Sequence, residues 1–326
     1  MLYSENLENI VFDRHNSHRA DELIVVSGYV GPSPVARVRD LPLNTTVIYG
    51  MYGQDKIRKS LHNSLKKLDE EIGNLSILYS NTPVHAKIYL WKYRGEISHV
   101  LVGSANFSAN GLRTDFREIL AEATIDTYAA LDTYLNSVLR NSIACSAIDA
   151  LEELEDEIPV SFVDPTKGIT CKMTLLDPRT GLVPERSGIN WGQSPRAHVR
   201  PNDAYIPIRK AHLTSCSKLF SPKTALPLLT AGRGRRTRQN DYVEFIWDDG
   251  IHFEGLFEGT QNHKGDNYPK NISSYPVKST LGEYIRNRIG VPSGQMVTLE
   301  HLTAYGRTDI EISLEGERIY YLDFSV

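Results

Sequence analysis

A histidine and a lysine two residues apart, His85 and Lys87, are the side chains of this sequence best suited to chemistry on a phosphate ester. In VHAKIYLW (84–91) apolar residues alternate with polar ones, which predicts a strand that directs His85 and Lys87 to the same side. A neutral imidazole can attack phosphorus, and an ammonium group can neutralise a non-bridging oxygen. The pair therefore suits nucleophilic attack on a phosphodiester, a reaction that needs no metal ion in this arrangement.

A second polar group follows at the end of the next predicted strand. Arg94-Gly95-Glu96 fits the turn of a hairpin, and the returning strand ends just before Ser104 and Asn106. Their hydroxyl and amide groups can donate hydrogen bonds to a phosphoryl group in the transition state. A third predicted strand begins at Glu118, whose carboxylate can hold the imidazole in one tautomer.

The elements that must position these residues alternate between strands and helices over the first 145 residues. Two β-branched runs, 22–30 and 44–52, predict buried strands. Apolar residues at helical spacing predict a helix over 55–73, with Asp55 as its cap, and a second helix around 131–139. This half is expected to be an α/β domain in which helices flank a mixed sheet.

The second half has a different pattern. Short apolar runs separated by Gly, Pro and Asn predict a mainly β domain, a barrel or pseudobarrel with one or two helices. MVTLEHL (296–302) is one of these runs, and only GEYIRNRIG (282–290) is predicted as a helix. Between the halves, residues 149–164 carry seven acidic residues and no basic one, which is typical of a linker or a short acidic helix. We expect the domains to span 1–148 and 171–326, with an acidic linker over 149–170.

Composition excludes several classes of protein. The chain has 326 residues, 40% of them hydrophobic, and a net charge of −4, which are values of a globular chain with two domains. No apolar run is long enough to span a membrane, and the first residues do not resemble a signal peptide. Cys145, Cys171 and Cys216 are widely spaced, which argues against a disulfide framework or a zinc site. A reducing, cytoplasmic setting is expected.

The net charge conceals a basic segment. Residues 196–240 contain ten basic residues and one acidic residue, a net charge of +9, which is typical of a surface that binds a polyanion. The alternative is an ordinary solvated basic surface. The candidate contacts in this segment are Arg196, Arg209, Lys210, Arg233, Arg235, Arg236 and Arg238.

Two polar loops carry side chains that can bond base edges in the major groove. The first is SGINWGQSPR (187–196), with Asn190, Trp191, Gln193 and Arg196. The second is GTQNHKGDNYPKN (259–271), with Gln261, Asn262, His263, Lys264 and Asn267. Either could equally be an ordinary polar loop, and Trp191 could be a core residue.

The motifs HxK at 85–87 and GSxN at 103–106 together resemble the signature of the phospholipase D superfamily. The resemblance implies that His85 forms a covalent phosphohistidine. Lys92 stands where the longer HxKxxxxD form has Asp, which favours the nuclease-like branch, and Glu118 lies about where that branch carries an acid. Enzymes of the superfamily use two HxK motifs, and this chain has one. We therefore expect a C2 homodimer, joined through the N-terminal domain, with one composite active site.

The whole chain resembles the BfiI/NgoFVII-type restriction endonucleases, whose C-terminal domain is similar to the plant B3 fold. The resemblance implies metal-independent, sequence-specific cleavage of double-stranded DNA, with the two polar loops on the two arms that grip the major groove. It implies no cofactor for the nuclease chemistry. ATP and Mg²⁺ are required only if a separate helicase-like ATPase subunit takes part.

Three alternatives remain: a non-specific nuclease of the same superfamily, a lipid-acting phospholipase D, and a binding module that has lost its activity. The acidic stretch suggests a further hypothesis. Its carboxylates can occupy the phosphate-binding cleft when DNA is absent, whereas the alternative is a solvated linker.

Overall fold

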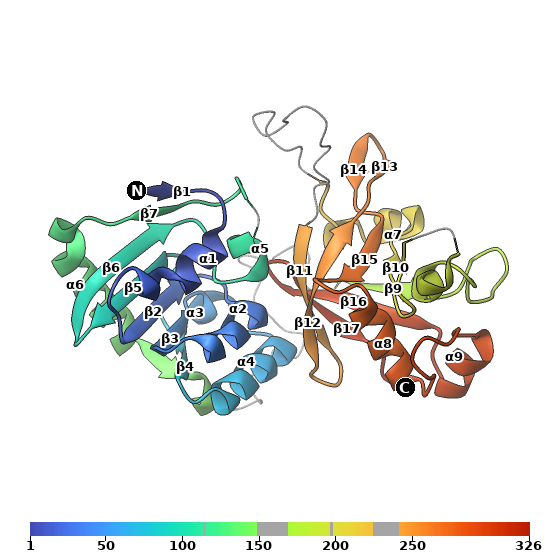
Figure 1. The fold of residues 1–326 in the computed structure, drawn as a ribbon, viewed down its shortest axis with the longest axis horizontal. Helices are drawn as coiled ribbons and strands as arrows, with labels where there is room; N and C mark the ends of the chain where they lie inside the picture. Colours follow the sequence, from blue (N-terminus) through green and yellow to red (C-terminus); the bar gives the residue numbers. More distant parts are fainter. Residues whose placement is uncertain (114, 149–168, 196–197, 224–240) are drawn as a thin grey trace. The chain divides into compact units, whose positions relative to one another are not determined.

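The computed structural model describes residues 1–113, 115–148, 169–195, 198–223 and 241–326 (Figure 1). The chain divides into two compact units, Met1–Val160 and Ser161–Val326, and each is described here by itself. The acidic stretch, Arg196 and the loop that carries Arg233, Arg235, Arg236 and Arg238 lie outside the described residues. None of the described helices is long and apolar enough to cross a membrane.

An eight-stranded mixed sheet, ordered β1-β7-β6-β5-β2-β3-β4-β8, organises the first unit. Strands β2, β3 and β4 are parallel, and the other pairings are antiparallel. The strands are Leu2–Tyr3 (β1), Glu22–Ser27 (β2), Asn44–Tyr49 (β3), Leu75–Ser80 (β4), Lys87–Tyr93 (β5), Glu96–Gly103 (β6), Leu120–Glu122 (β7) and Ser142–Ala144 (β8). The described helices are Leu7–Phe12 (α1), Pro32–Arg37 (α2), Tyr52–Asp55 (α3), Lys59–Glu71 (α4), Ala109–Arg113 (α5) and Tyr128–Arg140 (α6).

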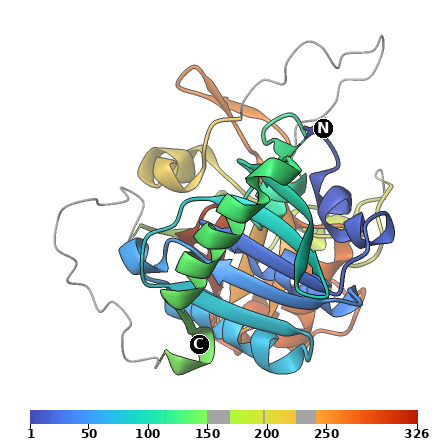
Figure 2. The same cartoon turned by 90° about the vertical axis from the view of Figure 1, so that its left-hand side faces the viewer.

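Helices bury both faces of this sheet. Helix α6 lies across one face, where Leu135 and Val138 pack with alternate residues of β2 and β5 (Figure 2). Tyr89 and Trp91, on the other face of β5, are also fully buried. The strand that carries Lys87 is therefore held from both sides, which makes it a rigid support for the residues at its end.

The helix expected over 55–73 is two helices. Helix α3 ends at Asp55, and α4 begins at Lys59. Lys56 between them has a φ of 57°, which lies in the left-handed region and interrupts the helical backbone. Asp55 therefore does not cap α4, and its carboxylate instead accepts a hydrogen bond from the Tyr29 hydroxyl at 2.8 Å.

The second unit is a seven-stranded sheet, ordered β10-β15-β12-β11-β17-β16-β9, that forms a nearly closed barrel, together with a separate two-stranded ribbon, β13-β14. Its core contains Trp247, Phe257 and Tyr320. The strands are Thr170–Thr174 (β9), Ile206–Pro207 (β10), Asp241–Trp247 (β11), His252–Glu258 (β12), Gln261–His263 (β13), Asp266–Tyr268 (β14), Asn271–Ser274 (β15), Asp309–Gly316 (β16) and Ile319–Asp323 (β17). The predicted mainly β domain is confirmed.

The prediction of one or two helices in this half is wrong, because the described residues contain three. Helix α8 (Ser279–Arg288) is where it was expected, but α7 (Lys210–Ser215) and α9 (Leu299–Tyr305) are also present. Helix α9 takes up most of the MVTLEHL run, because Thr298 and His301 form a capping box at its start. The alternating apolar residues of this run are also compatible with a strand, but the capping box favours the helix.

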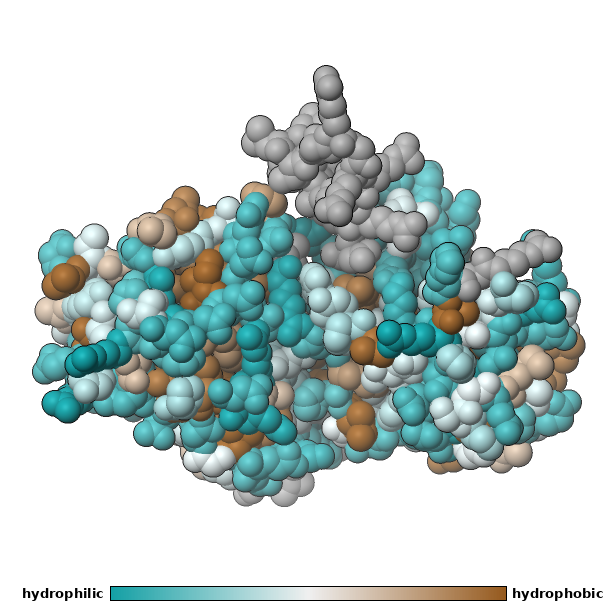
Figure 3. Space-filling model, viewed as in Figure 1, coloured by the Kyte–Doolittle hydropathy of each residue, from teal (hydrophilic) through white to brown (hydrophobic). Residues whose placement is uncertain are grey.

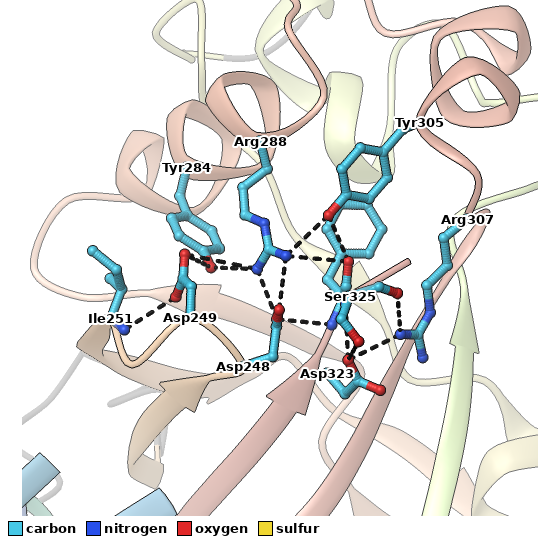
Figure 4. A network of polar contacts seen from close by, with 10 residues as sticks. Asp248, Asp249, Ile251, Tyr284, Arg288, Tyr305, Arg307, Asp323 and Ser325 are labelled. Carbon is cyan, nitrogen blue, oxygen red and sulfur yellow. Dashed lines mark hydrogen bonds and ion pairs between the residues drawn. The ribbon is translucent and has the colours of Figure 1, made fainter. Parts of the chain in front are cut away.

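An ion-pair network ties α8 to the turn after β11 and to the end of α9 (Figure 4). Arg288 binds both carboxylate oxygens of Asp248, at 2.7 and 2.8 Å, and the hydroxyl oxygens of Tyr284 and Tyr305, both at 2.9 Å.

The face drawn in Figure 3 is mainly hydrophilic, with apolar side chains in small separate groups.

Candidate active site and DNA-recognition surface

His85 and Lys87 stand at the start of β5. Lys87 is its first residue, and its backbone is paired with Ser27 at the end of β2. The Lys87 ammonium group donates to the His85 carbonyl oxygen at 2.9 Å and lies 3.2 and 3.1 Å from Nδ1 and Nε2 of the imidazole. The His85 ring is exposed, whereas Lys87 is buried. The cation is thus fixed close to an imidazole that solvent and substrate can reach.

The predicted hairpin delivers Asn106 to the same place. Arg94 and Gly95 form its turn with φ values of 53° and 83°, and β6 then returns beside β5. The side-chain oxygen of the buried Asn106 accepts hydrogen bonds from the Tyr29 amide at 3.3 Å and from Ser27 Oγ at 3.4 Å. These contacts hold the amide oxygen of Asn106 against the end of β2.

Gly28 is the point on which the three side chains converge. A Cβ atom at this position would lie 3.0 Å from the His85 ring, 3.3 Å from Lys87 Nζ and 3.5 Å from Asn106 Oδ1. Tyr29 follows, with its ring edge-on to that of His85 at a centroid distance of 6.0 Å. Neither Gly28 nor Tyr29 is among the residues predicted from the sequence. The available signal was a glycine at the end of a buried strand.

Ser27 orders the backbone around this point. It is fully buried at the end of β2, and its hydroxyl donates to the Tyr29 carbonyl at 2.6 Å. The same oxygen accepts a hydrogen bond from the Phe107 amide at 2.9 Å. Ser27 therefore joins the segment after β2 to the segment that carries Asn106.

Ser104 and Glu118 flank the site. The Ser104 hydroxyl accepts a hydrogen bond from the Ile119 amide at 3.1 Å, and the Ser104 amide donates to the Ile119 carbonyl at 3.0 Å. Glu118 precedes β7 rather than beginning it. Burial, and then the charge of Glu118, raise the pKa of Tyr89. The role of Glu118 as the acid that orients His85 stays a prediction.

Two of the residues predicted to contact DNA direct side-chain hydrogen bonds to groups of their own domain. The Asn190 side chain is fully buried and uses all four of its hydrogen bonds, to Pro184, Val297 (both backbone groups) and Arg286. The Arg209 guanidinium donates to the carbonyl oxygens of Thr174 and Leu176, and burial lowers its pKa. Their hydrogen-bonding groups serve the fold, so neither residue is retained as a DNA contact.

Gln193 and Gln261 each donate from the side-chain amide to backbone carbonyls of the domain. Gln193 donates to Gly294 at 2.7 Å. Gln261 donates to Ile208 at 2.6 Å and to Pro269 at 2.9 Å, which attaches the ribbon to β10. The amide groups of both side chains thus stabilise the bases of the two polar loops.

The remaining described candidates are more accessible. Figure 1 shows the β13-β14 ribbon extending from the sheet, with the left-handed Lys264 and Gly265 at its tip. Trp191 is half-buried, with Tyr205 at a centroid distance of 5.7 Å and Lys278 Nζ 5.3 Å from its ring. His263 is half-buried against Tyr268, and the exposed candidates are Lys210, Asn262, Lys264 and Asn267.

Among the described residues, no group of three or more His, Cys, Asp or Glu side chains is placed to hold a metal ion. The three cysteines are free and buried.

Two family models match successive parts of this chain. Residues 5–152 match the NgoFVII restriction endonuclease N-terminal PLD domain, and residues 155–315 match the NgoFVII C-terminal B3-like DNA-binding domain. The chain belongs to the NgoFVII restriction endonuclease family. This confirms the resemblance carried by the HxK and GSxN motifs. The NgoFVII-type chain is a restriction endonuclease of the phospholipase D superfamily that binds DNA through its B3-like domain.

Three solved structures are similar to part of this NgoFVII-type chain. NucT from Helicobacter pylori is 18% identical over 44% of this chain and 97% of its own, with a TM-score of 0.33. Polyphosphate kinase from Porphyromonas gingivalis is 12% identical over 48% of this chain and 24% of its own, with a TM-score of 0.29. Nuc from Salmonella typhimurium, a phospholipase D family member, is 9% identical over 41% of this chain and 88% of its own, with a TM-score of 0.28. No curated protein matched the sequence.

Proposed function

We propose that this restriction endonuclease cleaves double-stranded DNA at a specific sequence, without a metal ion, through a covalent phosphohistidine on His85. The observation that carries the proposal is the convergence of His85, Lys87 and Asn106 on Gly28. The three side chains together supply a nucleophile, a cation and an amide within reach of one phosphoryl group.

The reaction proceeds in two displacements. A ring nitrogen of His85 attacks phosphorus and the bond to the leaving oxygen breaks, while the partner's His85 gives that oxygen a proton. Water then attacks the phosphohistidine, the partner's His85 accepts a proton from the water, and the phosphorus–nitrogen bond breaks. Lys87 and Asn106 stabilise the non-bridging oxygens in both steps, and Ser104 supports the turn that carries Asn106.

One composite site per homodimer follows from the single HxK motif. The proposed dimer surface lies beside Ser104, where Leu2, Phe116 and Ile119 are 64%, 41% and 46% exposed. Leu2 pairs with Ala121, two residues after Ile119, and the Phe116 amide donates to the carbonyl of Ser4, two residues after Leu2, so the three residues lie on neighbouring segments. The proposed site needs a second copy of the chain. Two chains that associate through this surface would bury its exposed apolar side chains, which favours a dimer there.

In this proposal residues 1–148 form the nuclease and dimerisation domain, and residues 171–326 form the recognition domain. DNA contacts are assigned to Trp191, Lys210 and the exposed residues of the β13-β14 ribbon. Arg196 and the arginines of 233–238 stay predictions, as do a helicase-like ATPase subunit and a cytoplasmic location.

The test is digestion of plasmid DNA by the purified protein in EDTA, with sequencing of the fragment ends. We expect discrete ends, and no cleavage by His85→Ala. An absolute requirement for Mg²⁺ in the absence of any motor subunit would refute the metal-independent mechanism. Scattered ends would identify a non-specific nuclease, and turnover of phospholipid vesicles but not of DNA would identify a lipid-acting enzyme.

A further inference from the structure

Arg286 is a buried cation in the C-terminal unit. It lies on α8 and is 1% exposed. Its Nε donates to the Gln295 carbonyl at 2.8 Å, and its Nη1 donates to the Gly282 carbonyl at 3.0 Å. Its Nη2 donates to the Ile189 carbonyl at 3.1 Å and to Asn190 Oδ1 at 3.3 Å.

None of these partners is a carboxylate, and no ion pair to Arg286 occurs in the part of the chain that the structure describes. Burying a guanidinium group without a counter-ion is unfavourable, and desolvation lowers its pKa. A planar group with several fixed donors can, however, hold several carbonyls in one geometry. The segments whose carbonyls Arg286 binds are therefore the parts of the domain that it holds in place.

Its partners come from separate segments of the chain that meet at one point. The 3₁₀ segment Gly188–Gln193 contributes Ile189 and Asn190, and Asn190 extends the contacts to both backbone groups of Val297. The Gly192 amide donates to the Asp203 carbonyl at 2.7 Å, and Gln193 donates to Gly294. The segment is thus fastened on both sides of Trp191.

Close packing reinforces this attachment. A Cβ atom at Gly192 would lie 2.4 Å from the carbonyl oxygens of Arg200 and Pro201. A Cβ atom at Gly282 would lie 2.1 Å from the Asn202 carbonyl and 3.0 Å from Arg286 Nη1. Neither glycine has room for a side chain, because the neighbouring backbone approaches it closely.

We propose that Arg286 is a positioning residue for DNA recognition, because it fixes the Gly188–Gln193 segment so that Trp191 is presented in one orientation. This inference rests on the proposed role of that segment in contacting DNA. Arg286 itself is too deeply buried to touch DNA, so its effect passes through Ile189 and Asn190.

Arg288 provides a matched control on the same helix. It also makes several hydrogen bonds, but to Asp248, Tyr284 and Tyr305 and not to the Gly188–Gln193 segment (Figure 4). Replacing either arginine by lysine keeps the charge and removes the fork of donors. The two variants therefore perturb the same domain but only one perturbs the segment.

The first measurement is acrylamide quenching of tryptophan fluorescence in the full chain. Trp91 and Trp247 are buried, so the quenchable signal comes mainly from the half-buried Trp191. Arg286→Lys should raise the quenching constant, whereas Arg288→Lys should leave it unchanged. Thermal unfolding of both variants shows whether their losses of stability are comparable.

The second measurement compares affinity for the cognate duplex, found from the fragment ends, with affinity for an unrelated duplex. Arg286→Lys should weaken cognate binding by about tenfold to a hundredfold, the value of one or two base contacts, and change non-specific binding by no more than about twofold. Arg288→Lys should change neither by more than about twofold. If Arg286→Lys does not fold, Asn190→Ala, which leaves Arg286 in place, should give the same pattern.

Unchanged quenching and unchanged cognate affinity in Arg286→Lys, or equal changes in both arginine variants, would overturn the inference. A wild-type enzyme that binds all duplexes equally would refute the proposed function instead. In that case the quenching result alone still decides whether Arg286 fixes the segment.

Discussion

Replacing Ser27 by alanine should both slow DNA cleavage and destabilise the fold. The hydroxyl touches no substrate, but it joins the segment after β2 to the Phe107 amide and lies 3.4 Å from the Asn106 amide oxygen. Without it, the buried Phe107 amide loses its partner, at a cost of about 1–3 kcal/mol in the free energy of unfolding. The Asn106 amide oxygen also loses its contact with the Ser27 hydroxyl.

The rate effect follows from the displacement of Asn106. A shift of about 1 Å in a group that contacts the reacting phosphoryl group can reduce the rate by about a hundredfold. Because the Tyr29 amide still holds Asn106, we expect a smaller loss, about tenfold to thirtyfold in the single-turnover rate, or about 1.4–2 kcal/mol in the activation free energy. The assay is cleavage of supercoiled plasmid with enzyme in excess over DNA.

Ser80→Ala is the matched control. Ser80 is also fully buried at the end of a strand of the same sheet, and its hydroxyl also donates to a carbonyl two residues on, that of Thr82, at 2.7 Å. Both variants should lose stability in thermal unfolding, but only Ser27→Ala should lose rate. Cleavage by Ser27→Ala within about twofold of the wild type, or equal losses in both variants, would show that Ser27 does not position Asn106.

Three further predictions concern the surface and stability. Ile119→Asp should shift the protein from dimer to monomer in light scattering and lower its cleavage activity, because a charge would enter the proposed apolar dimer surface; an unchanged mass would move the interface elsewhere. Burial lowers the pKa of His99 from 6.5 to about 4, so the unfolded chain takes up a proton at a higher pH than the folded chain does. The free energy of unfolding should therefore fall by about 1–3 kcal/mol between pH 6.5 and 4. His99→Gln should remove that part of the pH dependence in denaturant titrations, and an unchanged profile would exclude His99 as its source. Arg288→Ala should destabilise the C-terminal unit by about 2–4 kcal/mol, because it leaves the largely buried Asp248 unpaired; a loss below about 1 kcal/mol in the same titrations would contradict this.

The strand-and-turn pattern around the catalytic residues could be predicted from the sequence because it is local. Alternation identified the strand of Lys87, and the Arg94-Gly95 pair identified its turn. Ser27 and Gly28 could not be found in this way. They reach the site only through the pairing of β2 with β5, a contact between segments 60 residues apart in the sequence.

The DNA-binding side chains show a different limit. Asn and Arg side chains that can bond base edges can equally bond backbone carbonyls, and the sequence pattern does not distinguish the two uses. Asn190 and Arg209 donate to the carbonyls of Val297 and Thr174, which are brought beside them only by tertiary packing. Among the described hydrogen bonds, none joins the exposed side chains of Asn262, Lys264 and Asn267 to a backbone carbonyl.

The central claim, one active site built from two chains, is tested most directly by a heterodimer in which only one subunit carries His85→Ala. Two affinity tags allow this species to be purified, and cleavage is measured in EDTA beside the wild-type and doubly substituted dimers. If each cleavage event needs His85 from both subunits, the heterodimer should be as inactive as the doubly substituted dimer. A heterodimer that retains about half of the wild-type activity would mean that each subunit has its own complete site, and it would contradict the composite site.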